Sequence, residues 1–129
     1  MMQSGLIGAV LYAKDLPRLT EFYSAVIGLK VLTMREGFAV LGQQPSQLVI
    51  VRIPKRIAES INIETPPVRR EDTPVKLVFA VADIIAARKN AIERNCDVDP
   101  IGNEWEFQGL KVCDGYDPEG NVFQLRYAV

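Results

Sequence analysis

The sequence predicts an α+β fold in which two modules, each a strand, a helix and three further strands, form a half-open eight-stranded curved sheet around a concave cleft. Three observations support this prediction. The same order of apolar segments occurs twice, the two copies lie 68 residues apart as measured from Asp15 to Asp83, and a proline-rich segment separates them. A single module of this kind cannot bury its own sheet, so we expect the two copies to pack together.

The length of 129 residues fits a single domain at residues 1–129. We divide it into a first module at residues 5–53, a connector at 54–74 and a second module at 75–128. Apolar residues make up 48% of the chain and charged residues 24%, which is typical of a globular protein with a core of its own. Because 15 basic side chains balance 16 acidic ones, we expect no nucleic-acid or membrane partner.

The chain contains no histidine, which excludes several common kinds of active site. A Ser-His-Asp or Cys-His relay, a two-histidine iron site and a histidine-ligated zinc site all need that residue. The two cysteines, Cys96 and Cys113, are too few for an all-cysteine zinc site. We expect them to be reduced thiols of a cytoplasmic protein, and the sequence leaves a single disulfide between them open.

The first apolar run, residues 6–13, is interpreted as a buried strand rather than an export signal or a membrane span. No basic residue precedes it, no small-residue cleavage site follows it, and it is shorter than the roughly 20 residues that cross a bilayer. Asp15 then provides a helix N-cap, Pro17 is tolerated in the first turn, and Gly28 is suited to ending the helix. The residues between them have the spacing of one apolar helix face: Leu16, Leu19, Phe22, Tyr23, Val26 and Ile27.

Three strands are predicted after this helix, at Lys30–Met34, Phe38–Leu41 and Leu48–Ile53. The segment Pro54–Pro74 contains four prolines and is predicted to be a surface connector, with one possible short helix at Ile57–Ile61. The basic pair at 69–70 is followed at once by the acidic pair at 71–72, so the connector does not form a basic patch.

The second module repeats the order of the first. It begins with a strand at Val75–Val81 and an N-cap at Asp83. The predicted helix ends near Asn95, and its apolar stripe consists of Ile84, Ala87, Ala91 and Ile92. The three strands that follow are predicted at Val98–Ile101, Phe107–Cys113 and Val122–Tyr127.

Two phrases of the sequence resemble those of the vicinal oxygen chelate superfamily, which includes glyoxalase I, extradiol dioxygenases and bleomycin-resistance proteins. The first phrase is Leu-Tyr-Ala-Lys-Asp-Leu at residues 11–16, followed by Phe-Tyr at 22–23 and Ile-Gly-Leu at 27–29. The second is Asp-Pro-Glu-Gly-Asn at residues 117–121, followed by Phe-Gln-Leu at 123–125. Together with the duplicated module, this resemblance covers nearly the whole chain and implies the glyoxalase/bleomycin-resistance/dioxygenase fold.

The superfamily is named for a divalent metal on the concave face, held by four side chains that are usually His, Glu or Gln. Carried over position by position, the resemblance assigns the four ligand positions to Gly8, Val49, Lys76 and Gln124. A divalent cation needs electron-pair donors, and a lysine ammonium repels it. The neighbouring residues 7–9 and 48–51 are apolar and offer no donor. We therefore expect no metal and no other cofactor, and metal-dependent activity is not expected.

Strand alternation predicts which residues face the cleft. Val122, Gln124 and Arg126 share one face of the last strand, and residues 76, 78 and 80 share one face of the strand at 75–81. An apolar concavity with few polar groups is typical of a small-molecule pocket. We predict that the ligand-binding residues of the cleft are Tyr12, Lys76, Gln124 and Arg126, with Trp105 at its lip.

Each of these residues also has a structural interpretation. The Lys76 ammonium can bind an anionic or carbonyl-bearing ligand or act as a base, or its stem can pack along the sheet with the ammonium in water. The Arg126 guanidinium can bind a carboxylate through two hydrogen bonds or remain a solvated charge near the strand end. Gln124 can bind a ligand or pair with Lys76. Tyr12 and Trp105 can stack on a ligand or pack against the protein.

No catalytic residue is predicted. Cys113 lies beside Asp114, whose negative charge would raise the pKa of the thiol, so a nucleophilic role is not expected. The four loop carboxylates, Glu36, Glu104, Asp114 and Asp117, are spread along the chain and form no evident acid/base pair.

Two functional hypotheses follow from the sequence. In the first, the protein is a metal-independent binding protein for a small, mostly apolar molecule that can carry an anionic group. Bleomycin-resistance proteins of the superfamily work in this way, and the resemblance also implies a homodimer, either side by side or domain-swapped. In the second, the protein is a glyoxalase- or dioxygenase-type enzyme, with a relocated metal or with a metal-free mechanism that uses Lys76 or Tyr12.

Overall fold

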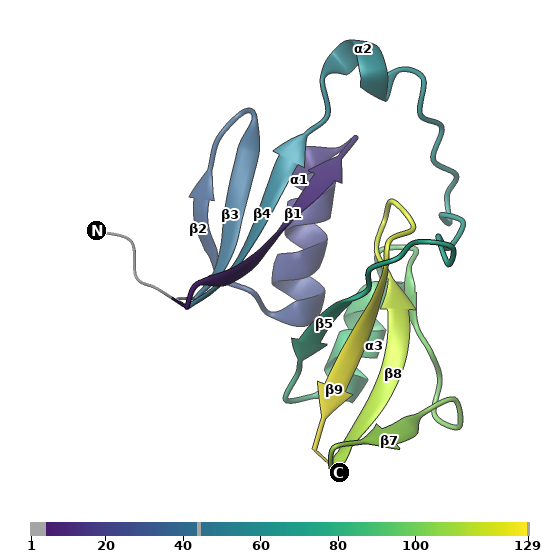
Figure 1. The fold of residues 1–129 in the computed structure, drawn as a ribbon. Helices are drawn as coiled ribbons and strands as arrows, with labels where there is room; N and C mark the ends of the chain where they lie inside the picture. The colour runs from purple at the N-terminus through teal and green to yellow at the C-terminus, as the bar shows by residue number, and fades with distance from the viewer. Residues whose placement is uncertain (1–4, 44, 129) are drawn as a thin grey trace.

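The computed structural model describes residues 5–43 and 45–128 and divides their strands into two sheets (Figure 1). Residues 1–4, 44 and 129 of the predicted domain lie outside the described residues. The first sheet has the strand order β1-β4-β3-β2 and the second the order β5-β9-β8-β6, with β7 paired to β8. The strands of the first sheet are β1 (Ile7–Ala13), β2 (Val31–Met34), β3 (Phe38–Gln43) and β4 (Ser46–Arg52). Those of the second are β5 (Leu77–Ala80), β6 (Asp97–Val98), β7 (Trp105–Phe107), β8 (Leu110–Tyr116) and β9 (Val122–Tyr127).

The two modules have matching topologies. In each, the first strand pairs in parallel with the last one, β1 with β4 and β5 with β9, and the last strand pairs antiparallel with the strand before it. A helix follows the first strand in both modules. This repetition confirms the predicted α+β fold of two related modules. The described strands form two sheets of four and five strands, rather than the single eight-stranded sheet that was predicted.

The two helices begin at the predicted aspartates. Asp15 accepts a hydrogen bond from the Arg18 N–H at 3.1 Å before α1 (Leu16–Phe22), and Asp83 accepts one from the Ala86 N–H at 3.0 Å before α3 (Ile84–Ile92). The first helix continues as a π-helical turn, η1 (Tyr23–Ile27), which ends at Gly28 with φ at 85°. The left-handed conformation at this position is the one that Gly adopts without steric cost.

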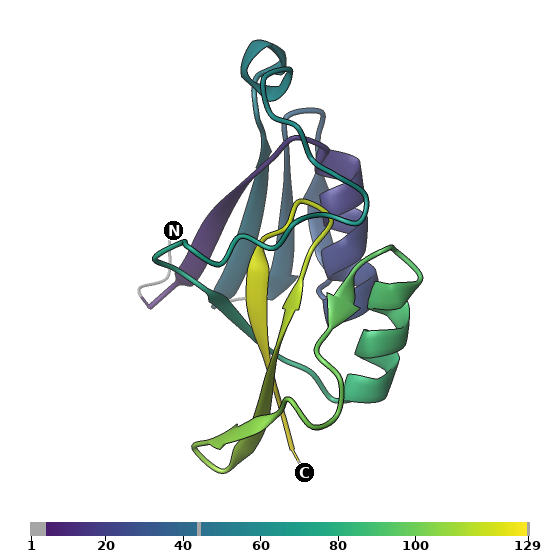
Figure 2. The same cartoon turned by 90° about the vertical axis from the view of Figure 1, so that its right-hand side faces the viewer.

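Both helices cover the same side of the molecule and leave the other side of each sheet open (Figure 2). Leu16, Leu19 and Phe22 are fully buried against the first sheet. Along β1 burial alternates: Ala9, Leu11 and Ala13 face the helices and are buried or half-buried, while Val10 and Tyr12 are 57% and 65% exposed. The predicted alternation of the first strand is therefore confirmed for residues 9–13, and its open face is apolar and exposed.

Three elements of the second module differ from the prediction. The predicted strand Phe107–Cys113 is a hairpin of β7 and β8, because Gln108 and Gly109 both have positive φ, at 52° and 80°, and reverse the chain. The predicted strand Val98–Ile101 is reduced to the two residues of β6. Ile92 is 59% exposed and does not belong to the buried stripe of α3, which consists of Ala87 and Ala91 with Ile84 packed beside them.

The turn between β8 and β9 joins the two modules. Asp117 is fully buried there and accepts a hydrogen bond from the Tyr23 hydroxyl at 2.7 Å. The Glu119 carboxylate accepts hydrogen bonds from the backbone N–H groups of Lys14 and Asp15, both at 2.8 Å, at the entry to α1. Burial raises the pKa values of the Asp117 carboxyl and the Tyr23 hydroxyl. The second module thus holds the start of the first helix in place.

The connector runs along the surface and is tied to both modules. Its short helix α2 (Lys55–Ala58) begins at Lys55, directly after the N-cap residue Pro54, rather than at the predicted residue 57. The Lys14 ammonium donates to the carbonyl of Ile61, and the Arg70 N–H donates to the Gly120 carbonyl at 2.8 Å. Where the structure describes the chain, no helix is both long and apolar enough to cross a bilayer.

Candidate functional site

A groove of about 700 Å³ lies between the edges of the two sheets, with β1 on one side and β5 on the other. We call it the intermodule groove. Its deeper lining is apolar and is supplied by Leu29, Leu41, Leu48, Leu77 and Phe79. Polar groups line it nearer to solvent, among them Gln47 and Lys76. The groove is therefore a mostly apolar concavity with few polar groups, which is the usual composition of a small-molecule site.

Two of the four positions that the resemblance assigned to metal ligands line this groove. Gly8 lies on β1 opposite Gln47 of β4, and a side chain at Gly8 would meet the Gln47 carbonyl oxygen at 2.8 Å. Lys76 lies directly before β5, and its ammonium forms an ion pair with Asp114 at 2.8 Å. The third position, Val49, is a half-buried residue of β4 between Val10 and Val40.

A second cavity of about 410 Å³ adjoins the groove at the end of the connector. We call it the polar cavity. It is lined by Arg70, Glu71, Thr73, Pro74, Val75, Lys76, Asp114 and Val122. Lys76 lines both cavities, so its ion pair with Asp114 lies where the apolar and polar spaces meet.

Gln124 occupies the fourth ligand position, and its partner is Arg126 and not Lys76, which the sequence analysis considered. The Arg126 Nε donates to its Oε1 at 2.9 Å, whereas Lys76 pairs with Asp114. The Arg126 guanidinium also stacks over the Phe107 ring, 4.9 Å from its centroid. Gln124 lies opposite Asp114 in the pairing of β8 with β9, so the two side chains share the open face of the second sheet.

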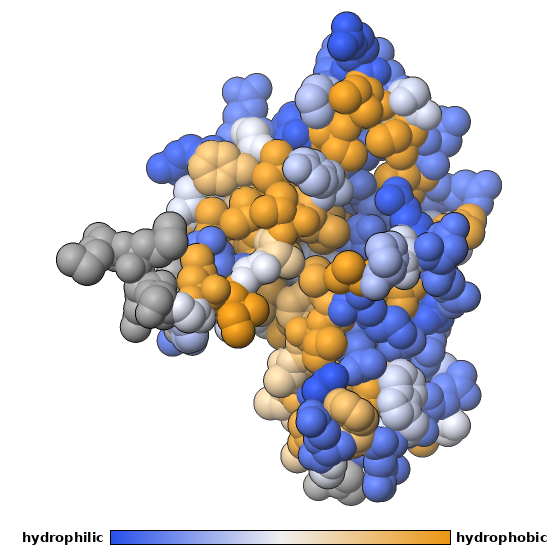
Figure 3. Space-filling model, viewed as in Figure 1, coloured by the Kyte–Doolittle hydropathy of each residue, from blue (hydrophilic) through white to orange (hydrophobic). Residues whose placement is uncertain are grey.

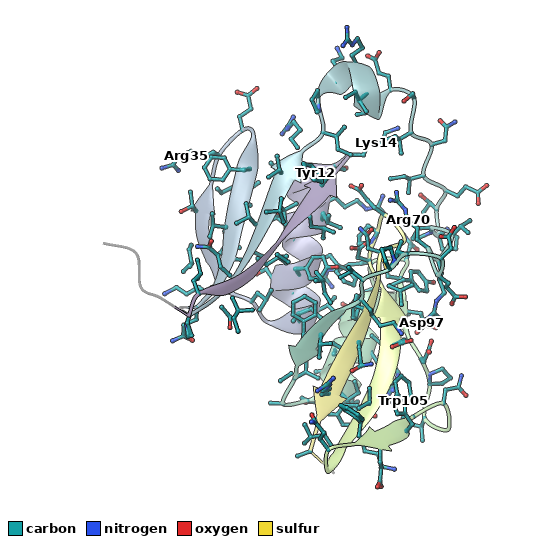
Figure 4. The ribbon with its side chains drawn as sticks, in the orientation of Figure 1. Tyr12, Lys14, Arg35, Arg70, Asp97 and Trp105 are labelled. Carbon is teal, nitrogen blue, oxygen red and sulfur yellow. The ribbon has the colours of Figure 1, made fainter. Side chains whose placement is uncertain are left out.

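The five predicted cleft residues do not form one cluster. Gln124 and Arg126 lie on β9 of the second sheet, and Lys76 directly precedes β5. Trp105 lies on β7, and both Trp105 and Arg126 pair with Val112 of β8. Tyr12 lies on β1 of the first sheet and is 65% exposed. Figure 4 shows Tyr12 and Trp105 toward opposite ends of the molecule. Within one chain, a small ligand at Lys76 cannot contact all five side chains.

Asp114 and Arg70 line the polar cavity but were not predicted as site residues. Asp114 was considered only as a neighbour of Cys113 and as one of several scattered loop carboxylates. Its position along β8 could have indicated a site residue. Side chains alternate between the two faces of a strand, so Asp114 lies on the same face as Val112 and Tyr116. Arg70 lines the polar cavity because the end of the connector pairs with Asn121, and no pattern in the sequence indicates that pairing.

The two cysteines are free and buried. Burial raises the pKa of the Cys96 thiol to about 12 and also raises the pKa of the Cys113 thiol. The direction for Cys113 agrees with the sequence analysis, but the main cause is burial and not the charge of Asp114. Neither thiol is suited to nucleophilic chemistry at neutral pH.

Solved structures of known proteins have the same fold over the whole chain. Fosfomycin resistance protein FosX from Listeria monocytogenes, complexed with Mn(II) and sulfate, has a TM-score of 0.67 at 16% identity, covering 99% of this chain and 93% of that one. An antibiotic-binding protein from a Streptomyces species has a TM-score of 0.63 at 20% identity, covering 100% and 99%. A glyoxalase/bleomycin resistance protein/dioxygenase from Alicyclobacillus acidocaldarius has a TM-score of 0.59 at 18% identity, covering 97% and 92%. No protein-family model and no curated protein sequence matches the chain.

At these identities the likeness establishes the fold. The chain has the glyoxalase/bleomycin-resistance/dioxygenase fold, which is the fold of the vicinal oxygen chelate superfamily to which these proteins belong. The fold implied by the resemblance of the two sequence phrases is therefore confirmed. Proteins of this fold serve as enzymes and as binding proteins, so the function has to be argued from the site.

Proposed function

We propose that the protein binds a small, mostly apolar molecule in the intermodule groove without a metal. The observation that carries this proposal is the groove itself, about 700 Å³ in volume and lined mainly by apolar residues, with a lysine at its polar end. Burial of an apolar ligand surface supplies the affinity, and the Lys76 ammonium attracts an anionic group on the ligand. An antibiotic-binding protein from a Streptomyces species has the same fold, which supports a binding role.

The residues at the four metal-ligand positions do not fit a divalent cation. Gly8 has no side chain, and Val49 offers only hydrocarbon. Lys76 is a cation that is already paired with Asp114, and the Gln124 oxygen accepts a hydrogen bond from Arg126. Among the described residues, no three acidic or cysteine side chains come together to form another metal site. A binding role is therefore better supported than metal-dependent catalysis.

The alternative is an enzyme of the glyoxalase or dioxygenase type. The observation in its favour is that a protein of the same fold, FosX from Listeria monocytogenes, binds Mn(II) in its solved structure. For the present chain this alternative needs a metal held by residues other than those at the four positions. Titration with nickel, manganese and iron(II), followed by calorimetry, tests it. Stoichiometric binding at micromolar affinity would favour the enzyme and overturn the metal-independent proposal.

We also propose that the protein works as a homodimer. The open face of the first sheet is apolar over a broad area, which Figure 3 shows continuing toward β5. Val10, Tyr12 and Phe38 contribute to it and are 57%, 65% and 40% exposed. Monomeric proteins rarely leave a large apolar sheet face uncovered. A second copy of the chain that covers this face would complete the site with residues from both chains.

Ligand binding is tested by a thermal-shift screen over small acids and aromatic compounds, carried out on the wild type and on Lys76→Ala. We expect apolar acids to raise the melting temperature of the wild type by several degrees and that of Lys76→Ala by less. Glu106→Gln is the matched control, because Glu106 is an exposed residue of β7 that pairs only with Lys111 at 3.7 Å among the described residues. A library in which no compound raises the melting temperature by more than about a degree or two would remove the basis of the proposal.

A further inference from the structure

The Lys76 side chain lies where the intermodule groove meets the polar cavity, because it lines both. Among the described residues it is the only charged side chain in the lining of the groove. It is also accessible: 42% of the lysine side chain is exposed, and so is the hydrogen bond that its ammonium donates to Asp114. A ligand whose apolar body occupies the groove can therefore bring a polar group to the Lys76 ammonium.

The positive charge of Lys76 is compensated by acidic neighbours. Its Nζ lies 2.8 Å from the Asp114 Oδ2. The polar cavity as a whole is lined by two basic residues, Arg70 and Lys76, and by two acidic ones, Glu71 and Asp114, so its formal charges cancel. A ligand anion at Lys76 would be attracted by the ammonium and repelled by the Asp114 carboxylate next to it. Much of the attraction is thereby offset.

The ammonium nevertheless keeps donors for a ligand. A lysine ammonium has three N–H donors, and among the described residues one of them is used, in the hydrogen bond to Asp114. The others can donate to a carbonyl oxygen, and a hydrogen bond from a charged donor is stronger than one between neutral groups. A neutral carbonyl compound also loses less hydration than a carboxylate when it leaves water for a mostly apolar groove. Because the compensated lysine returns little of that hydration energy to an anion, the site favours the neutral group.

We propose that the protein prefers neutral apolar compounds with a carbonyl group, such as amides, over carboxylic acids of the same shape. The Lys76 ammonium donates to the carbonyl oxygen, and the apolar body occupies the intermodule groove. Asp114 determines this preference through its charge next to Lys76, without contacting the ligand. The inference rests on the proposed binding function and adds the chemical class of the ligand's polar group.

The test compares an amide and an acid with the same carbon skeleton. Isothermal titration calorimetry at neutral pH measures the binding of 3-phenylpropionamide and of 3-phenylpropionate. For the wild type we expect the amide to bind about three- to tenfold more tightly. Asp114→Asn removes the negative charge and keeps the shape of the side chain, so the affinity of the acid relative to the amide should rise about tenfold. Glu106→Gln removes an acidic charge elsewhere in the second sheet and should retain the wild-type ratio.

The outcomes separate this inference from the proposed function. If the acid binds to the wild type as tightly as the amide or more tightly, the preference for neutral ligands is wrong and the binding function stands. If neither compound binds at millimolar concentration, both are wrong. A ratio that stays unchanged in Asp114→Asn would overturn the role of Asp114.

Lys76→Met provides a second variant that does not alter Asp114. It removes the ammonium and leaves the Asp114 charge uncompensated, so the acid should lose more affinity than the amide. Equal losses would contradict the role of the two charges. The wild-type ratio decides on the preference itself even if neither variant folds.

Discussion

At the residue scale, the carboxylate of Glu119 makes a direct contact between the two modules. It is 6% exposed and accepts two backbone hydrogen bonds at 2.8 Å, from Lys14 and Asp15 of the other module. Hydrogen bonds to a charged acceptor are stronger than those between neutral groups. The same turn contributes Asp117, whose buried carboxylate binds the Tyr23 hydroxyl. These contacts fix the entry to α1 relative to the second sheet.

We predict that Glu119→Ala lowers the free energy of unfolding by about 1 to 3 kcal/mol, because it leaves two partly buried N–H groups without an acceptor. Glu119→Gln should lower the free energy of unfolding by less, because the amide oxygen of the glutamine can still accept one of the two hydrogen bonds. Urea denaturation followed by circular dichroism measures both changes. The control is Glu64→Ala, because Glu64 is an exposed glutamate of the connector, and its effect should stay within about 0.5 kcal/mol. Equal losses in the Glu119 and Glu64 alanine variants would contradict this role for Glu119.

The site residues illustrate what a sequence can indicate at this scale. Alternation in the strands correctly assigned Gln124 and Arg126 to the open face, because that assignment needs only the strand period. The partners of these side chains were not predictable. Whether Lys76 pairs with Gln124 or with Asp114 depends on the positions of side chains on strands that are distant in the sequence. Local periodicity carries no information about such long-range pairs.

At the element scale, the turn between β8 and β9 also contacts the connector. Gly120 has φ at 84°, and a Cβ atom at this residue would lie 2.2 Å from the carbonyl oxygen of Val68. The backbone of the connector thus packs directly against the turn, and the Arg70 N–H donates to the Gly120 carbonyl. Only Gly combines this conformation with this close approach.

We predict that Gly120→Ala is considerably more destabilising than Gly109→Ala. Gly109, in the turn between β7 and β8, has a similar φ of 80° but open space where the Cβ would lie. Gly109→Ala should therefore lower the free energy of unfolding by only about 1 to 2 kcal/mol, which is the cost of the left-handed backbone conformation for a residue with a Cβ atom. Gly120→Ala should cost a further 1 to 3 kcal/mol, roughly, because the connector has to move. Thermal unfolding of the two variants measures the difference, and equal melting temperatures would contradict the close packing of the connector.

The elements that the sequence predicted well have strong local signals. The two aspartate caps and the alternating apolar residues of β1, β4 and β9 gave helix starts and strands close to those in the structure. The β7–β8 hairpin was missed because the residues around Gln108 are all compatible with an extended strand, and the Gln-Gly pair is a weak turn signal. The π-helical turn at Tyr23–Ile27 was not predicted either, since its apolar spacing is the same as that of an α-helix.

At the scale of the whole molecule, the open face of the first sheet determines how copies of the chain can associate. In the described residues β1 pairs with β4 alone, and its sequence Ile-Gly-Ala-Val-Leu-Tyr-Ala contains no charged residue or proline. The Ile7 N–H donates to Pro45 on the β4 side, so by alternation Gly8, Val10 and Tyr12 direct their backbone groups away from β4. This edge borders the intermodule groove opposite β5, so the surface that remains for a second copy is the open face of the sheet, where Val10 and Tyr12 are exposed.

A second copy of the chain is the occupant that suits this face, because an apolar face favours another apolar surface over a charged partner. The fold was predictable at this scale because duplication of a module constrains the topology of both halves. The assembly was suggested only by resemblance, since the sequence of one chain does not say which surfaces remain open. Lys76 lines the intermodule groove and Tyr12 does not, so a site that uses both side chains would have to draw on two chains.

The dimer leads to a prediction that a single substitution can test. In sedimentation velocity we expect the wild type to form a species of twice the 14.4 kDa chain mass at micromolar concentration. Val10→Lys introduces a charge at the centre of β1, where the side chain is 57% exposed, and should shift the protein to the monomer without lowering its stability. Ile85→Lys adds the same charge at a residue of α3 that is 70% exposed on the helical side, and should remain dimeric. A wild type that stays monomeric at high concentration, or a dimer that tolerates Val10→Lys, would show that the open face of the first sheet has a different partner.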